Sequence, residues 1–309
     1  MLEKRGAYGL PLLTRENSMN QFLQQLINGV SIGSIYALMA VGYSLVYSIM
    51  NFSNFAHGGV IMLSAYIGYY AVTLLGLSFL PALLVTALAA TAIAGIIERL
   101  AYRPLRQRNA PTLYFIISAM GMSILLENLV IATIGPQFKT YPILFQETTI
   151  SLGNLSVSKL DILMLIISAI SLILLVLFLN KTRAGLAVRA ATYNARASQL
   201  MGVNVDGIIF LVFALGGALA GIAGVFFGMK YTVYAQAGVI TNKAFIAAVF
   251  GGLGSLPGAI LGSILLGVIE TFVAVAKSQF RDLIAFVILI AVLVIRPSGI
   301  MGKSSEDKA

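Results

Sequence analysis

The sequence predicts an all-α protein that crosses a lipid bilayer about eight times. Hydrophobic residues make up 59% of its 309 residues and charged residues only 10%, whereas soluble domains carry about 25% charged residues. Residues 208–228 form a run of 21 residues without a charge, and ~20 apolar residues are enough to cross the hydrocarbon core. These runs are continuous rather than alternating, which favours helices over the strands of a membrane barrel.

We expect eight membrane-spanning helices. They are predicted at about 22–49, 58–77, 79–97, 112–134, 161–179, 208–228, 255–276 and 283–295, the last extending back through Phe280. Two places do not fit a simple series of spans. Residues 50–58 are weakly polar, and residues 243–258 begin apolar but are interrupted by glycines, Ser255 and Pro257. Because discontinuous helices are typical of transport sites, we expect re-entrant or broken segments there. The alternative at 243–258 is an ordinary loop followed by a glycine-rich packing helix.

The chain divides into three parts. Residues 1–18 are polar and are expected to form a flexible N-terminal extension, with Met19 as an alternative start. Residues 19–302 form a single transmembrane domain, and residues 303–309 form a C-terminal tail. The longest polar stretch, at 180–206, has 27 residues, so we expect no ATPase or soluble receptor domain within this chain.

The basic residues predict the orientation. Loops 98–110 and 180–206 are rich in arginine and are expected to be cytoplasmic, whereas 135–160 is expected to face outward. The C-terminal tail is also expected inside. Three crossings before the first basic loop would place the N-terminal basic residues outside, against the positive-inside rule. Either 22–58 contains an extra crossing or re-entrant piece, or the rule fails there. The net charge of +9 lies in short loops without a long basic face, so we exclude nucleic acid as a partner.

The second basic loop contains an expected amphipathic helix at 186–202. Leu186, Ala190, Tyr193, Ala197, Leu200 and Met201 share one face, and Arg189 and Arg196 share another. Gly202 is placed as a C-terminal stop. We interpret this helix as a docking element for a cytoplasmic partner, with Arg189, Tyr193, Ala195, Arg196, Leu200, Met201 and Gly202 as the docking residues. The alternative is a helix that lies passively at the lipid headgroups.

Several polar or helix-breaking residues within the spans are candidates for a pathway or gate. Glu127 and Glu270 lie inside apolar runs, where a charge is costly and faces the bundle interior or lies near the interface. Asn51, Asn54 and His57 are interpreted as a polar lining or as helix caps. Gly251, Gly252, Gly254 and Pro257 predict a non-helical break that forms a gate or binding-site wall. With no cysteine and one histidine, the chain is expected to lack thiol chemistry and a multi-histidine metal site.

Six segments together resemble the LivH-type permease subunit of branched-chain amino acid ABC importers. They are INGVSIGSIYALMAVGYSLVYSIMNFSNFAHGGVIML near the start, IERLAYRPLR, ISAMGMSILLEN, RAATYNARASQLMGVNVD in the second basic loop, KAFIAAVFGGLGSLPGAILGSILLGVIE, and the closing RPSGIMG. The resemblance covers roughly residues 19–302.

The resemblance implies a multi-pass protein of a bacterial or archaeal inner membrane. It implies a homologous LivM-like permease, LivG- and LivF-like ATPases and an extracytoplasmic amino-acid-binding protein as partners, alongside membrane lipid. ATP and Mg²⁺ would be used by the ATPases, and no cofactor would be bound by this chain. RAATYNARASQLMG corresponds to the family loop that engages an ATPase.

We therefore expect a permease for leucine, isoleucine and valine that is not itself an enzyme. A related ABC permease for urea or short amides remains an alternative. Rivals from other classes are an intramembrane enzyme, for which the sequence shows no nucleophile–base set, and an autonomous ion-coupled transporter or channel, toward which only Glu127 and Glu270 point.

Overall fold

The computed structural model describes residues 15–142, 149–152 and 155–302, and it is almost entirely helical. Its main helices are α1 (Arg15–Met50), α2 (Ala56–Thr73), α3 (Phe79–Ile97), α5 (Thr112–Thr133), α6 (Lys159–Lys181), α9 (Val205–Lys230), α11 (Leu256–Ala276) and α12 (Arg281–Ile295). Shorter helices are η1 (Glu98–Tyr102), α4 (Arg103–Gln107), α7 (Arg183–Tyr193), α8 (Ala195–Leu200), η2 (Ala235–Ile240), α10 (Thr241–Gly251) and η3 (Ser278–Phe280). Strands β1 (Thr149–Leu152) and β2 (Leu155–Ser158) form an antiparallel hairpin in which Ile150 pairs with Val157.

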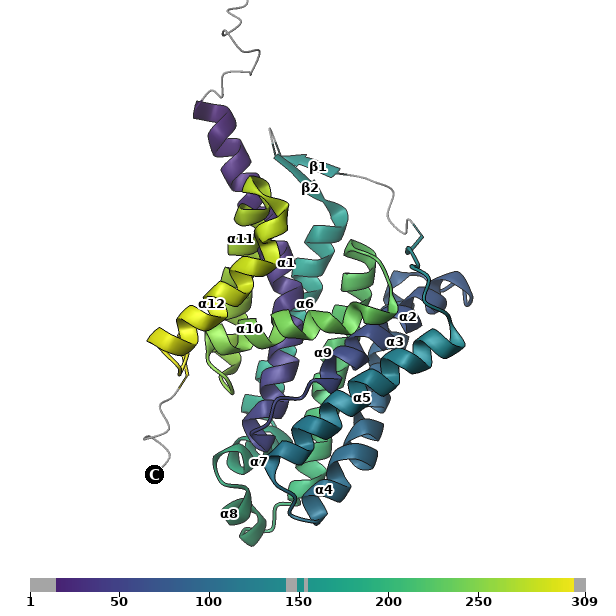
Figure 1. Ribbon diagram of the computed structural model, residues 1–309, viewed down its shortest axis with the longest axis vertical. Helices are drawn as coiled ribbons and strands as arrows, with labels where there is room; N and C mark the ends of the chain where they lie inside the picture. The colour runs from purple at the N-terminus through teal and green to yellow at the C-terminus, as the bar shows by residue number, and fades with distance from the viewer. Residues whose placement is uncertain (1–14, 143–148, 153–154, 303–309) are drawn as a thin grey trace, which may run out of the picture.

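The helices form an elongated bundle, whose two ends are described in turn (Figure 1). At one end, here the hairpin end, the start of α1 lies beside β1 and β2. At the other, here the basic end, α4, α7 and α8 lie together, and Arg106 of α4 bonds Asp206 of α9 through Nε at 2.9 Å. The two arginine-rich loops therefore share one end, as their common predicted orientation requires. Helix α10 crosses the middle of the molecule between the two ends (Figure 1).

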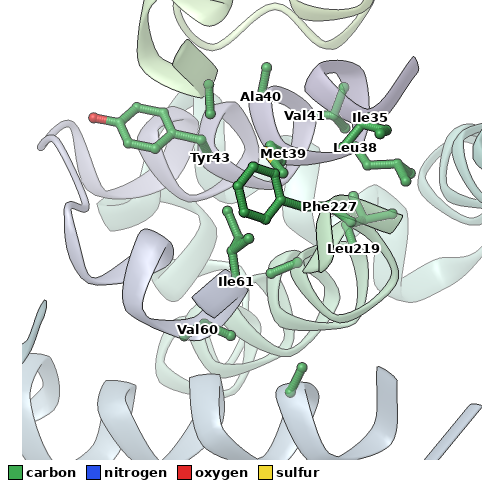
Figure 2. Packing of buried hydrophobic residues seen from close by; sticks show 14 of the residues in the cluster. Ile35, Leu38, Met39, Ala40, Val41, Tyr43, Val60, Ile61, Leu219 and Phe227 are labelled. Carbon is green, nitrogen blue, oxygen red and sulfur yellow. The ribbon is translucent and has the colours of Figure 1, made fainter. Parts of the chain in front are cut away.

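The core centres on α1, which packs against α6, α9, α10 and α11. Its residues Ile35 to Tyr43 meet side chains of α2 and α9, such as Ile61 and Phe227 (Figure 2). The closest approach is to α11, where a Cβ added to Gly29 would lie 2.7 Å from the Cα of Val268. Glycine at this crossing allows the two backbones to touch, as is common where membrane helices pack. Helix α1 is thus a buried central helix rather than a lipid-facing span.

The predicted spans are largely confirmed. Seven described helices are long and apolar enough to cross a membrane, at 19–50, 79–107, 112–133, 159–181, 205–230, 256–276 and 278–295. The eighth expected span, 58–77, is shorter than predicted, corresponds to α2, and is not among these seven. Helix α2 is mostly buried between its neighbours, so it needs less apolar surface than a helix that faces lipid.

The first span shows which explanation of the N-terminal charges holds. Helix α1 is continuous from Arg15 to Met50, and α2 begins at Ala56. Residues 22–58 therefore contain no additional crossing, and Arg15 lies at the end opposite the basic loops. The positive-inside rule therefore fails for this residue if the basic loops are cytoplasmic. Residues 15–18 belong to α1, so the predicted flexible extension was drawn too long. Its other residues, 1–14, and the tail 303–309 lie outside the described residues.

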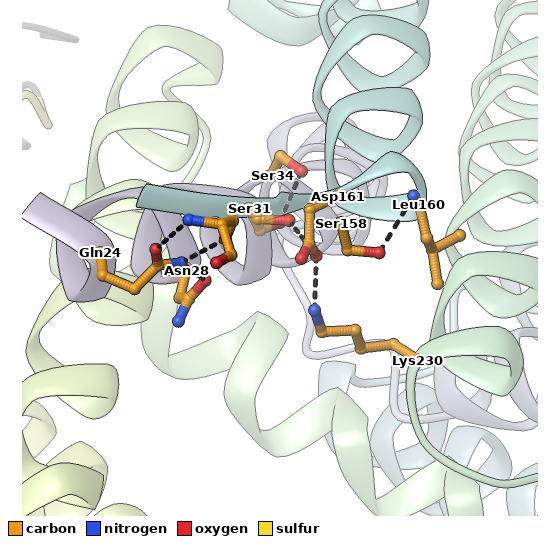
Figure 3. Close-up of polar contacts among 9 residues, drawn as sticks. Gln24, Asn28, Ser31, Ser34, Ser158, Leu160, Asp161 and Lys230 are labelled. Atoms are coloured by element: carbon orange, nitrogen blue, oxygen red, sulfur yellow. Dashed lines mark hydrogen bonds and ion pairs between the residues drawn. The ribbon is translucent and has the colours of Figure 1, made fainter. Parts of the chain in front are cut away.

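Polar contacts fasten the hairpin end. Gln24 of α1 exchanges two hydrogen bonds with the backbone of Ser156 in β2, at 2.8 and 3.0 Å. Asp161, in the first turn of α6, accepts a hydrogen bond from Ser31 at 2.8 Å and pairs with Lys230 at the end of α9 (Figure 3). Because Asp161 is buried, this cluster locks α1, α6 and α9 together. The hairpin itself was not predicted from the sequence.

Candidate functional site

The predicted docking residues all lie exposed at the basic end. Arg189, Tyr193, Ala195, Arg196, Leu200, Met201 and Gly202 are all exposed. Leu200 and Met201 are each 85% exposed, although both are large and apolar. The opposite side of α7, with Val188 and Ala191, is buried, and α7 packs on α6 and α9. The apolar face is therefore exposed, which is the arrangement expected of a surface that binds another chain or lies at the lipid headgroups.

The prediction of one continuous helix at 186–202 is wrong. Asn194 has extended backbone angles, φ −153° and ψ 100°, and separates α7 from α8. Its side-chain oxygen accepts a hydrogen bond from the backbone N–H of Ala197 at 2.9 Å. Asparagine is a favoured N-cap, and this bond satisfies one of the free amides at the start of α8. Gly202 does end the element, with a φ of +85°.

Glu270 lies in a buried ion network between α1, α10, α11 and α12. Its side chain is 1% exposed, and Oε2 accepts hydrogen bonds from the hydroxyl of Tyr36 at 2.9 Å and from Nζ of Lys243 at 3.0 Å. Nζ of Lys243 also lies 2.9 Å from Oδ1 of Asp282, whose side chain is 74% exposed. The charge of Glu270 is thus neutralised inside the bundle, and Lys243 ties α10 to both α11 and α12.

A cavity of about 590 Å³ adjoins this network. It lies between α1, the η2–α10 segment, the end of α9 and α12, and we name it the α10–α12 cavity. Its charged lining residues are Lys243, Arg281 and Asp282. Phe227, Ile240, Ile246, Ala285 and Phe286 are among its apolar lining residues. An apolar pocket with a few convergent polar groups is typical of a small-molecule site.

Glu127 lines a second cavity of about 350 Å³ between α2, α5 and η2. Thr241 and Asn242 line it as well, and the hydroxyl of Thr241 is buried without a hydrogen-bond partner among the described residues. Val239 and Asn242 line both this cavity and the α10–α12 cavity. The structure therefore places Glu127 and Glu270 on either side of the junction between η2 and α10.

The predicted polar cluster near His57 lines neither the α10–α12 cavity nor the cavity beside Glu127. Asn51 is exposed and ends α1 with a φ of +52°. Asn54 accepts a hydrogen bond from the hydroxyl of Tyr102 at 2.7 Å. Asn54 and His57 border a void of only about 10 Å³, which is about the smallest that holds one water molecule. In this conformation the cluster joins the loop after α1 to η1.

The predicted break in 243–258 is confirmed. Helix α10 ends at Gly251 and α11 begins at Leu256, with Gly252 and Gly254 at φ values of +112° and +82°. The carbonyls of Phe250 and Gly251 accept hydrogen bonds from the amides of Ile300 and Met301, at 3.0 and 2.9 Å. The C-terminal turn thus satisfies backbone groups that the break leaves free.

The position of the break differs in one respect from the expectation. Pro257 lies in the first turn of α11, where proline is well tolerated because that amide needs no helical partner. None of the three cavities described above is lined by Gly251, Gly252, Gly254 or Pro257. Their role as a gate therefore stays a prediction.

Sequence reasoning missed Tyr36, Lys243, Arg281 and Asp282. The signal for a cation was present, because a carboxylate such as Glu270 inside an apolar run requires a partner. Lys243 opens the broken segment that precedes it, 27 residues earlier in the chain. Within the described residues, no group of three or more histidine, aspartate or glutamate side chains could hold a metal ion.

The fold and these sites together define a multi-pass helical membrane protein of the transport class. Two of its cavities and the Glu270 ion network lie around a broken segment inside the bundle, and it exposes an apolar surface at its basic end. A family model described as the branched-chain amino acid transport system permease component matches residues 25–293. The chain belongs to this family.

Individual relatives agree with the family match. The chain is 42% identical over 302 residues to the high-affinity branched-chain amino acid transport system permease protein BraD of Pseudomonas aeruginosa, covering 93% of this chain and 98% of the relative. It is 38% identical over 303 residues to the corresponding permease protein LivH of Escherichia coli K12, covering 93% and 97%. The probable branched-chain amino acid permease LivH of Methanocaldococcus jannaschii is 30% identical, with coverage of 90% and 92%.

The fold also resembles that of a solved structure. The chain described as PsaBC from Streptococcus pneumoniae in complex with Fab aligns with a TM-score of 0.50 and 16% sequence identity, over 89% of this chain and 92% of that chain. At this identity the likeness concerns the fold alone.

Proposed function

We propose that this chain is the membrane-spanning permease subunit of an ATP-driven importer for leucine, isoleucine and valine. The observation that carries the proposal is the 42% identity to a branched-chain amino acid permease across nearly the whole of both chains. The substrate is a zwitterion with an apolar side chain. Spans with few charges and a cavity with both charged and apolar lining suit such a cargo.

The proposed partners are a homologous LivM-like permease, LivG- and LivF-like ATPases and an extracytoplasmic binding protein, all in or at an inner membrane. ATP binding by the ATPases would shift the permease pair between conformations that open to either side, because the nucleotide-bound partner has a different affinity for each. This chain would itself bind no ATP or Mg²⁺.

The exposed surface on α7 and α8 is the proposed site of ATPase docking. Burying one large apolar side chain contributes about 1.5–3 kcal/mol, and Tyr193, Leu200 and Met201 are all available. Arg189 and Arg196 frame this surface with positive charge. The Asn194 cap and the buried side of α7 hold the surface against the bundle, so motion of an attached ATPase would be transmitted to α6 and α9.

Transport by the reconstituted complex tests the proposal. The two permeases, the ATPases and the binding protein are placed in proteoliposomes, and uptake of radiolabelled leucine is measured with and without ATP. We expect ATP-dependent uptake that unlabelled isoleucine and valine inhibit and urea does not. Uptake of leucine without ATP would support an autonomous transporter, and uptake of urea alone would support the related amide permeases.

A further inference from the structure

The charged groups at the α10–α12 cavity balance one another. Lys243 and Arg281 are cations, while Asp282 on the cavity wall and Glu270 behind Lys243 are anions. The four groups therefore sum to zero. A ligand with a net charge would leave an unbalanced charge at membrane depth, which is costly. A neutral molecule with two separated charges would not.

Arg281 and Asp282 can still bond a ligand, whereas Lys243 is already paired. Lys243 already bonds Glu270 and Asp282, at 3.0 and 2.9 Å. Arg281 takes part in no ion pair or side-chain hydrogen bond among the described residues, and it is only half-buried. Asp282 uses Oδ1 for Lys243, so its second oxygen can accept from another donor. A guanidinium suits a carboxylate because it donates two parallel hydrogen bonds.

The rest of the cavity suits an aliphatic side chain. Ile240 and Ile246 line it from the η2–α10 segment, and Ala285 and Phe286 line it from α12, one turn beyond Arg281 and Asp282. Charged and apolar groups thus lie next to one another on the same helix. The volume of about 590 Å³ is within the range of about 300–1,000 Å³ found for small-molecule pockets.

We propose that the α10–α12 cavity binds the free amino acid during transport, with Arg281 holding its carboxylate, Asp282 its ammonium group and the apolar wall its side chain. This proposal rests on the proposed function and assigns its substrate contacts. The cavity adjoins Tyr231, which follows the hairpin end of α9. With the basic loops cytoplasmic, it would lie in the outer half of the bilayer, where cargo arrives from an extracytoplasmic binding protein.

Uptake by the complete reconstituted complex tests the charged contacts. Arg281→Gln is expected to lower leucine uptake about tenfold or more, the loss expected for one hydrogen bond to a charged group. Arg281→Lys should retain more uptake than Arg281→Gln. Arg296→Gln is the matched control, because Arg296 is an exposed arginine just past the other end of α12 and lines no cavity described here. ATP hydrolysis stimulated by the leucine-loaded binding protein should stay within twofold of the unsubstituted complex in Arg296→Gln.

Thiol protection measures occupancy directly. The chain has no native cysteine, so Ser278→Cys places a single thiol on the cavity wall. Ser78→Cys serves as the control, because Ser78 is exposed between α2 and α3 and is not among the cavity residues. A membrane-impermeant maleimide is added on the side of the binding protein. Leucine-loaded binding protein should slow labelling at position 278 severalfold, relative to empty binding protein, and leave labelling at position 78 unchanged. Adding Arg281→Gln should abolish the protection.

The results separate the two proposals. If the unsubstituted complex takes up no leucine, the proposed function fails. If it takes up leucine, full uptake by Arg281→Gln or equal labelling of Ser278→Cys with loaded and empty binding protein overturns the cavity assignment alone. Equal loss of uptake in Arg281→Gln and Arg296→Gln would show a general charge effect on α12, and would also overturn it.

Discussion

Replacing Lys243 alone should lower the stability of the chain more than replacing Lys243 and Glu270 together. In Lys243→Met, Glu270 keeps only the hydroxyl of Tyr36 as a partner while its side chain is 1% exposed. Breaking a buried pair by deleting one member typically costs about 3–5 kcal/mol, because a charge is left uncompensated. Adding Glu270→Gln removes that charge. We therefore expect the double variant to be more stable than Lys243→Met by at least about 1.4 kcal/mol, a tenfold change in the unfolding equilibrium.

The free energy of unfolding is measured for the four members of this cycle by circular dichroism, in mixed micelles with increasing SDS. Asp282→Asn is the control within the same network. Its side chain is 74% exposed, and exposed ion pairs contribute about 0–1 kcal/mol. If the costs of Lys243→Met and Glu270→Gln simply add, so that the double variant is the least stable, the two residues are not energetically coupled and the reasoning from burial is wrong.

Two further outcomes follow from the break and from the docking surface. Gly252→Ala should destabilise the chain more than Gly254→Ala in the same unfolding assay. Both positions have positive φ, but an added Cβ would lie 2.4 Å from the Gly302 amide nitrogen at the first and no closer than 3.8 Å to any neighbour at the second; equal costs would contradict the packing of the C-terminal turn. Arg196→Glu should uncouple ATP hydrolysis from uptake and weaken co-purification of the ATPases, whereas Arg108→Glu, at the same end but off the docking surface, should do neither. Unchanged coupling in Arg196→Glu would refute the proposed docking surface.

The membrane-spanning helices could be predicted from the sequence because their signal is local. Runs of about 20 apolar residues leave a helix as the main way to satisfy the backbone in lipid. The break after Gly251 was equally local, since several residues of low helix propensity occur within seven positions. In both cases neighbours in the chain decide the structure.

The contacts that form the candidate sites could not be predicted in this way. Tyr36 and Glu270 are 234 residues apart, and only the packing of α1 against α11 brings them together. The break at Asn194 was missed because the apolar period continues across it. The helix is interrupted there because Asn194 is extended and its side chain caps the next helix at Ala197. Hydrophobic period reports which face is apolar and is less informative about where a helix is capped.

The structure places some of the predicted pathway residues at large cavities and others away from them. Glu127 lines one of the two cavities beside the η2–α10 junction, and Glu270 pairs with Lys243, which lines the other. Asn54 and His57 instead border a void too small for a substrate. Burying a mid-membrane acid carries a large energetic cost, and Glu270 has the specific partner that this cost requires. The pathway roles of Glu127 and Glu270 stay predictions.

The most direct test of the central claim is leucine uptake by the complete complex in proteoliposomes. Radiolabelled leucine is supplied on its binding protein, and uptake is compared with ATP and with a non-hydrolysable analogue inside the vesicles. We predict accumulation that requires hydrolysable ATP and that is lost when this chain is left out. Accumulation of leucine that is the same with and without this chain, or no accumulation with all subunits present, would contradict its role as a branched-chain amino acid permease.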